Sequence, residues 1–68
     1  MNPITITLNG QPLPLPAGAT LADAARASGV QPPFAAAVNL QFVPRARYPE
    51  TLLNNGDQVE LISPVTGG

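Results

Sequence analysis

Residues 4–15 read ITITLNGQPLPL, and this stretch decides the fold of the chain. Its first half alternates apolar residues with threonine, which is the period-two pattern of a strand with one buried face. Asn9-Gly10 follows, and this dipeptide between two alternating segments is the strongest short-range signal for a hairpin turn. The alternation resumes after the turn with two leucines. Residues 3–16 are therefore predicted to form a β-hairpin.

Prolines occupy every second position beyond this turn, at Pro12, Pro14 and Pro16. Proline has no N–H group to donate to a neighbouring strand, so within sheets it is confined to edge strands. With a period of two, the missing N–H groups all fall on the same side of the strand. We therefore expect an edge strand whose other side pairs with the first strand. A polyproline ligand is the alternative for such a segment, but it leaves the Asn-Gly turn unexplained.

A short helix is predicted over residues 21–28. Thr20 is placed to cap its first turn, with Asp23 three residues later in a variant of the capping box. Gly29 suits the left-handed residue that ends many helices. The segment is short and rich in alanine, so it requires packing on a sheet to be stable. Leu21 is accordingly expected in the core.

A second hairpin is predicted after the helix. Residues 34–38 are apolar and suit a buried strand. Asn39 and Leu40 are expected to turn this strand, and residues 41–43 to return beside it before a proline ends the pairing. Residues 45–53 follow neither the strand period nor the helix period, so a loop with one helical turn is expected there.

The turn signal of residues 54–57 begins a last strand, which Pro64 ends. The order is thus hairpin, helix, hairpin, irregular crossover and strand. The simplest way to bury one face of every element is a mixed sheet of four to five strands with the helix packed across it and the last strand between the two hairpins. This is the α+β, ubiquitin-like β-grasp fold. We predict a domain over residues 1–64 and a flexible tail over residues 65–68.

The composition excludes most catalytic and metal chemistry. The 68 residues include no cysteine and no histidine, which removes thiolate ligands, redox pairs and the commonest general base. The four carboxylates are scattered, and Asp57 and Glu60 lie an odd number of residues apart, so alternation should place them on opposite faces of a strand. We therefore expect no catalytic residue, no metal site and no enzymatic activity.

Charge and hydropathy limit the partners of the chain. Three arginines, no lysine and a net charge of −1 do not form the basic footprint of a nucleic-acid-binding protein. The apolar stretches are too short for a membrane span, and the N-terminus lacks the basic and apolar regions of a signal peptide. We expect a cytoplasmic monomer that binds neither nucleic acid nor a membrane.

The sequence ends in Val65-Thr66-Gly67-Gly68. Glycine carries no side chain and restricts the backbone very little, so such a segment can thread into a narrow channel of another protein. We interpret these residues as a reactive arm, with Gly68 as the site of covalent modification and Thr66 and Gly67 as the residues that thread. The alternative is a frayed chain end, which most domains have.

Together these pieces resemble the ThiS sulfur carriers of thiamine biosynthesis along nearly the whole chain. The segments that carry the resemblance are residues 6–10, residues 18–23, Val38-Asn39, residues 42–45, residues 55–57 and Gly67-Gly68. The proline-rich second strand departs from the family pattern. Pro64-Val65-Thr66 is also similar to the tail of the small subunit of molybdopterin synthase, so that pathway remains an alternative. A ubiquitin-like protein modifier and a plain β-grasp binding module also stay open as functions of the chain.

The resemblance implies that the chain is a protein cosubstrate. An E1-like, ThiF-like adenylating enzyme would use ATP and magnesium to convert the Gly68 carboxylate into an acyl-adenylate. A persulfide from a cysteine desulfurase or another sulfur donor system would displace AMP, and the product would be a thiocarboxylate. A ThiG-like thiazole synthase would then receive the sulfur. The chain itself is expected to bind no cofactor.

Three residues near the second hairpin are candidates for partner contact: Arg45, Phe42 and Tyr48. Arg45 lies in a Val-Pro-Arg motif that resembles the family. Alternatively, Tyr48 packs over the edge of a solvated loop and contacts no partner. Arg47 is expected to be solvated. Phe42 is expected in an exposed apolar patch on the sheet, as ubiquitin-like proteins often present, whereas core packing is expected for Leu61.

Overall fold

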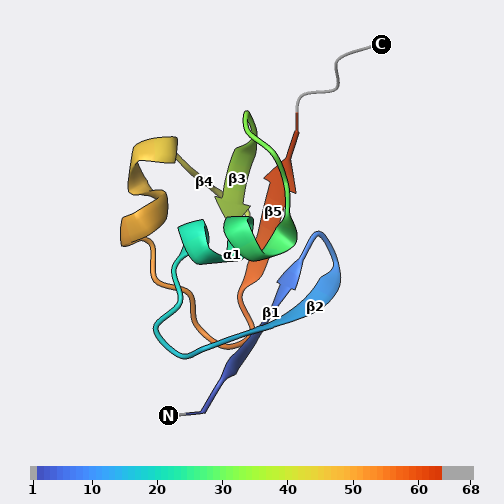
Figure 1. Cartoon of the computed structure of the whole chain (residues 1–68), viewed down its shortest axis with the longest axis vertical. Coiled ribbons are helices and arrows are strands. Elements are labelled where there is room, and N and C mark those ends of the chain that lie inside the picture. The colour runs from blue at the N-terminus through green and yellow to red at the C-terminus, as the bar shows by residue number, and fades with distance from the viewer. Residues whose placement is uncertain (1, 64–68) are drawn as a thin grey trace.

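The computed structural model describes residues 2–63 of the chain (Figure 1). The elements, in chain order, are β1 (Ile4–Leu8), β2 (Gln11–Leu15), α1 (Leu21–Ser28), β3 (Ala35–Val38), β4 (Gln41–Val43), the 3₁₀ helix η1 (Arg45–Glu50) and β5 (Gln58–Ile62). Both predicted hairpins, the predicted helix and the last strand are confirmed. The predicted boundary at residue 64 and the tail over residues 65–68 lie outside the described residues.

The five strands form one mixed sheet in the order β2-β1-β5-β3-β4. β1 and β5 are parallel, and every other neighbouring pair is antiparallel. β5 therefore lies between the two hairpins, and α1 lies across one face of the sheet (Figure 1). This arrangement confirms the β-grasp prediction.

The first hairpin shows how a proline-rich segment can be a strand. Leu8 and Gln11 flank a two-residue turn, so they form a hydrogen-bonded pair. Along β2, every second residue after Gln11 is again in a hydrogen-bonded pair with β1. Pro12 and Pro14 fall at the intervening positions, where the nitrogen atom faces away from β1. β2 is an edge strand, as predicted. Its outer side therefore has no N–H donor at Pro12 or Pro14 with which another strand could pair.

The helix has both predicted caps. The Thr20 side-chain oxygen accepts a hydrogen bond from the Asp23 N–H at 3.3 Å, and the Asp23 carboxylate accepts one from the Thr20 N–H at 2.9 Å. The Thr20 N–H contributes most to holding the pKa of Asp23 below its usual value, and the Thr20 hydroxyl, which donates to the same carboxylate at 3.2 Å, adds to it. Gly29 ends the helix with a φ of 77°, a left-handed conformation that suits glycine.

The core lies between α1 and the covered face of the sheet. Ile6, Leu21 and Val59 are its largest fully buried side chains. The other buried apolar residues are Leu15, Ala19, Ala24, Ala25, Ala36, Tyr48, Leu53 and Leu61. Leu21 and Leu61 are thus core residues, as expected.

Two details of the second half differ from the prediction. The apolar run over residues 34–38 begins its strand only at Ala35, and Ala36 is the buried residue of that strand, because Phe34 leaves the sheet to stack on Tyr48. The segment that was expected to be a loop with one helical turn contains a six-residue 3₁₀ helix, η1. The buried Tyr48 ring fixes that helix against the core.

Candidate functional site

The residues predicted to be modified or threaded, Gly68, Gly67 and Thr66, lie outside the described residues. The chain leads to them through β5, whose side chains alternate strictly between the two faces of the sheet. Val59 and Leu61 are buried, whereas Gln58, Glu60 and Ile62 are exposed. The candidate site therefore consists of the end of β5 and the sheet surface beside it.

An apolar strip runs across the open face of the sheet, opposite the helix. Ala37 pairs with Phe42 on one side and with Glu60 on the other, and Ala35 pairs with Ile62, so these side chains share one face. Phe42 is 70% exposed and Ile62 is 60% exposed. We call Phe42, Ala37, Ala35 and Ile62 the open-face strip. It ends at the residue where β5 ends.

Phe42 is exposed, as predicted, and its place in a docking patch stays a prediction. The other large apolar side chain on that face of these strands is Ile62, which sequence reasoning did not single out. The signal that could have found Ile62 is the alternation of β5: once Val59 and Leu61 are assigned to the core, period two places Ile62 on the opposite face. Glu60 lies on the same face and gives the strip one negative charge.

A shallow hollow of about 300 Å³ lies beside the open-face strip. Its walls include Gly10 from the first hairpin turn and Leu40 from the second, and its floor includes Gln58 and Glu60 from β5. Leu40 is almost fully exposed on the rim. The hollow therefore lies between the tips of the two hairpins, over the first half of β5.

The prediction that Tyr48 contacts a partner is corrected by its burial. Only 8% of the residue is exposed. Its ring stacks on that of Phe34 with centroids 5.6 Å apart and planes 6° from parallel, and its hydroxyl donates to the Phe34 carbonyl oxygen at 3.3 Å. The apolar ring of Tyr48 is packed inside the domain, and its one polar atom has a hydrogen-bond partner there.

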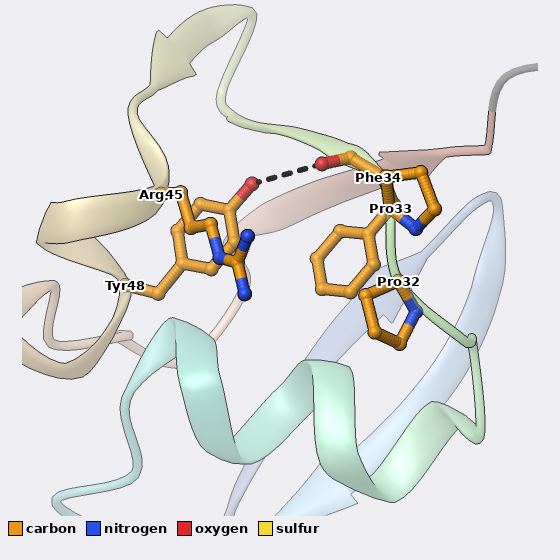
Figure 2. A pocket seen from close by; sticks show the side chains of 5 residues that line it. All are labelled: Pro32, Pro33, Phe34, Arg45 and Tyr48. Carbon is orange, nitrogen blue, oxygen red and sulfur yellow. Dashed lines mark hydrogen bonds between the residues drawn. The ribbon is translucent and has the colours of Figure 1, made fainter.

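Arg45 lies in a different place from the open-face strip. It is exposed, and with Pro32, Pro33, Phe34 and Tyr48 it lines a cavity of about 50 Å³ (Figure 2). Figure 2 shows its guanidinium beside the Tyr48 ring. The structure therefore places Phe42 and Arg45, the two exposed contact candidates, at separate positions. Arg47 is also exposed, as expected.

The two hairpin turns hold β5 from opposite sides through asparagine side chains. Asn9 accepts a hydrogen bond from the Leu61 N–H at 2.9 Å and donates one to the Leu61 carbonyl oxygen at 3.1 Å. Asn39 accepts one from the Gln58 N–H at 2.9 Å and donates one to the Asp57 carboxylate at 3.1 Å. Sequence reasoning identified both asparagines as turn residues but did not predict these side-chain contacts.

Residues 2–63 contain no group of three metal-ligating side chains. The same residues include no helix that is long and apolar enough to cross a membrane. The arrangement pairs β5 on both sides and leaves an apolar surface beside the end of that strand.

Comparisons with known proteins agree with this architecture. A solved structure of the thiamine biosynthesis protein (ThiS) from Geobacter metallireducens superposes with a TM-score of 0.78, with 22% sequence identity over 96% of this chain and 100% of that one. At that identity the likeness shows the fold. No curated protein sequence matches the chain significantly. A sequence model of the ThiS family matches residues 6–68. A match over almost the whole chain, on a β-grasp sheet, shows that this protein belongs to the ThiS family of small sulfur carriers.

Proposed function

We propose that this protein carries sulfur for thiamine biosynthesis as a thiocarboxylate on Gly68. The observation that carries the proposal is the extent of the family match, which continues through the final Gly67-Gly68 of the sequence. The absence of cysteine and histidine supports a role as cosubstrate, because the chain offers neither a thiolate nor an imidazole for catalysis. The chemistry must then come from partner enzymes.

The Gly68 carboxylate must be activated before sulfur can be attached. With a pKa near 3.5, a terminal carboxyl group is an anion at neutral pH and repels nucleophiles. An E1-like, ThiF-like enzyme joins it to AMP, using Mg-ATP and releasing pyrophosphate. The terminal sulfur of a persulfide in the sulfur donor system then attacks the carbonyl carbon and expels AMP. A second thiol cleaves the resulting sulfur–sulfur bond, which leaves the thiocarboxylate and a disulfide on the donor system.

The thiocarboxylate is then a sulfur nucleophile for a ThiG-like thiazole synthase. In this sequence of reactions the chain has to present the same end to successive enzymes. Thr66 and Gly67 thread into the active-site channel of each partner, where glycine is needed because it adds no width. ATP and magnesium bind to the adenylating enzyme, and we assign this chain no cofactor.

We propose that the open-face strip docks the domain on the adenylating enzyme. Phe42 and Ile62 are large apolar side chains that remain exposed, and Ile62 lies six residues before Gly68. A partner with an apolar surface and a basic residue opposite Glu60 fits this face. Arg45, at its separate position beside Tyr48, is assigned a secondary contact.

The experiment is intact mass spectrometry of the protein after incubation with the adenylating enzyme, Mg-ATP and a sulfur source. We expect the mass change of one oxygen replaced by one sulfur, and no change in a variant that lacks Gly68. An amide-linked conjugate would instead indicate a protein modifier. An unchanged mass with an active partner enzyme would contradict the carrier function. Transfer of the sulfur to thiazole synthase, compared with transfer to molybdopterin precursor, separates the two pathways.

Gly67→Val tests the threading role separately from the chemistry. The variant should have the wild-type unfolding midpoint, because the substitution lies beyond the predicted end of the domain at residue 64, and its kcat/KM for adenylation should fall by at least tenfold. Gly67→Ala is the matched control, and its smaller side chain should cause a smaller loss. Wild-type adenylation kinetics for Gly67→Val would contradict the steric argument.

A further inference from the structure

The side chain of Asn9 continues the pairing of β5 beyond the point where β1 ends. The backbones of β1 and β5 pair at Thr7 with Gln58 and at Leu8 with Val59. The chain then enters the hairpin turn, where Asn9 has a φ of 51° and its N–H donates to the Val59 carbonyl oxygen at 2.9 Å. Within residues 2–63, no strand backbone pairs with β5 beyond this point on the β1 side.

Leu61 has a partner on that side only because of the Asn9 carboxamide. Backbone groups of alternate residues in a strand point the same way, so the N–H and C=O of Leu61 face the β1 side, as the C=O of Val59 does. The carboxamide has the donor and acceptor of a peptide group, and it meets both Leu61 groups, at 2.9 and 3.1 Å. Without it, the backbone of a buried residue would lose two hydrogen bonds.

The position of Leu61 gives this contact its importance. Leu61 is the penultimate residue of β5, and Gly68 follows Ile62 by six residues. Six residues reach at most about 20 Å when fully extended, so the place and direction in which β5 ends limit where the Gly68 carboxylate can lie while the domain is docked. Misplacement of a reacting group by about 1 Å can already slow a reaction substantially.

We propose that Asn9 is a positioning residue for the adenylation of Gly68. Its carboxamide fixes the direction in which the chain leaves the sheet, while the open-face strip fixes the domain on the partner enzyme. This inference rests on the proposed function and adds a residue to it that lies near the opposite end of the sequence.

Asn39 provides a matched control within the same molecule. It occupies the same position in the second hairpin turn, also with a φ of 51°, and its N–H and Oδ1 bind the backbone of Gln58 at 2.7 and 2.9 Å. Gln58 is the first residue of β5, so this clamp lies at the end of the strand that is farther from Gly68. Glycine tolerates positive φ, so Asn9→Gly and Asn39→Gly each remove the carboxamide and leave the turn unstrained.

The experiment compares the two variants in unfolding, in amide hydrogen exchange and in adenylation kinetics followed by pyrophosphate release. We expect the two glycine variants to lose similar amounts of unfolding free energy. Exchange at the Leu61 and Ile62 amides should accelerate in Asn9→Gly by more than in Asn39→Gly. The kcat/KM for adenylation should fall by roughly tenfold in Asn9→Gly and by less than twofold in Asn39→Gly. Asn9→Asp keeps an acceptor for the Leu61 N–H but loses the donor. Its exchange rates and its kcat/KM should therefore lie between those of wild type and Asn9→Gly.

Two outcomes would overturn the inference. One is an equal fall in kcat/KM for both glycine variants, which would indicate a general effect of stability. The other is unchanged exchange at Leu61 and Ile62 in Asn9→Gly, which can be observed whether or not the partner enzyme acts. Failure of the wild-type protein itself to be adenylated would count against the proposed function, and the exchange result would still decide whether Asn9 holds the end of β5.

Discussion

The two hairpins flank β5 and both turn through an asparagine with a φ of 51°, but the second also leaves a large apolar side chain on the open face of the sheet. The first hairpin buries Ile6 and Leu15 under the helix. The second contributes the small Ala36 to the core, with Val38 and Val43 packed against it, and leaves Phe42 on the open face. The same turn chemistry therefore serves two purposes. The first hairpin contributes large side chains to the core, and the second leaves an apolar surface that we propose meets a partner.

Strand position and residue size explain this division. β1 is an interior strand, paired with β2 on one side and β5 on the other, so its apolar residues lie in the centre of the core. β4 is a three-residue edge strand, and its neighbour β3 supplies three consecutive alanines. Those alanines bury little area, and they leave the Phe42 ring standing above the open face.

The largest expected effect comes from removing the apolar side chain that each hairpin contributes. Ile6→Ala should lower the free energy of unfolding by about 2–5 kcal/mol, because it leaves a cavity at a fully buried position. Phe42→Ala should change it by no more than about 0.5 kcal/mol, since most of the ring is already in solvent. Urea denaturation measures both values.

Adenylation kinetics complete that comparison. Phe42→Ala should raise the KM of the adenylating enzyme for this protein at unchanged fold, because it removes the largest side chain of the open-face strip. Equal destabilisation by the two substitutions would show that the Phe42 ring is as much a part of the core as the Ile6 side chain. An unchanged KM would contradict docking on this face.

A smaller effect on stability is expected when the second residue of each turn is replaced by the residue type found in the other turn. Leu40 has a φ of 70° and is 82% exposed, whereas the equivalent residue of the first turn is Gly10, with a φ of 83°. A left-handed conformation costs a residue other than glycine about 1–2 kcal/mol. Leu40→Gly should therefore stabilise the protein by about 1 kcal/mol, and Gly10→Leu should destabilise it by a similar amount.

Thermal or urea unfolding of these two variants checks the prediction. A Cβ atom at Gly10 would meet no other atom within 4 Å, so its substitution tests the backbone conformation without a steric clash. If Leu40→Gly is neutral or destabilising, the Leu40 side chain makes a stabilising contact on the rim of the hollow that offsets the strain.

The smallest expected effect is the loss of stability in acid, which should be the same in both hairpins. The Asp23 pKa is lowered in the folded protein by its hydrogen bonds to Thr20, so the ionised form stabilises the fold. That stabilisation is complete above the unfolded pKa, near 3.9, and is lost as the pH falls through the lower folded value. Asp23→Asn should therefore show a weaker fall in stability between about pH 5 and pH 2 than wild type.

Amide exchange during the same acid titration locates the effect. Asp23 caps the helix, which packs on the covered face of the sheet, so both hairpins should lose protection to the same degree. Selective loss in one hairpin, or an acid dependence that Asp23→Asn leaves unchanged, would assign the acid sensitivity to another carboxylate.

Local chemistry explains why so much of the fold could be predicted. The Asn9-Gly10 turn, the Thr20 and Asp23 capping box, the Gly29 stop and the period-two alternation each act over a few residues, so they are visible without knowledge of distant contacts. Core packing was also predicted for Leu61, whereas the exposure of Phe42 was predicted from the apolar patch that ubiquitin-like proteins often present. The local signals did not reveal that Tyr48 is buried, because its partner Phe34 lies fourteen residues earlier and is brought to it only by folding.

The order of the elements, both turns, the capped helix and the diglycine end follow from the amino-acid sequence alone, because they depend on backbone preferences and on side chains close together in the chain. Folding in three dimensions was needed to establish that Phe42 and Ile62 share one face, that Tyr48 belongs to the core, and that Asn9 holds Leu61 across 52 residues. Those relations are set by the registers in which β3 and β5 pair and by the parallel alignment of β1 with β5. Register is a property of two strands together, and neither strand specifies it alone.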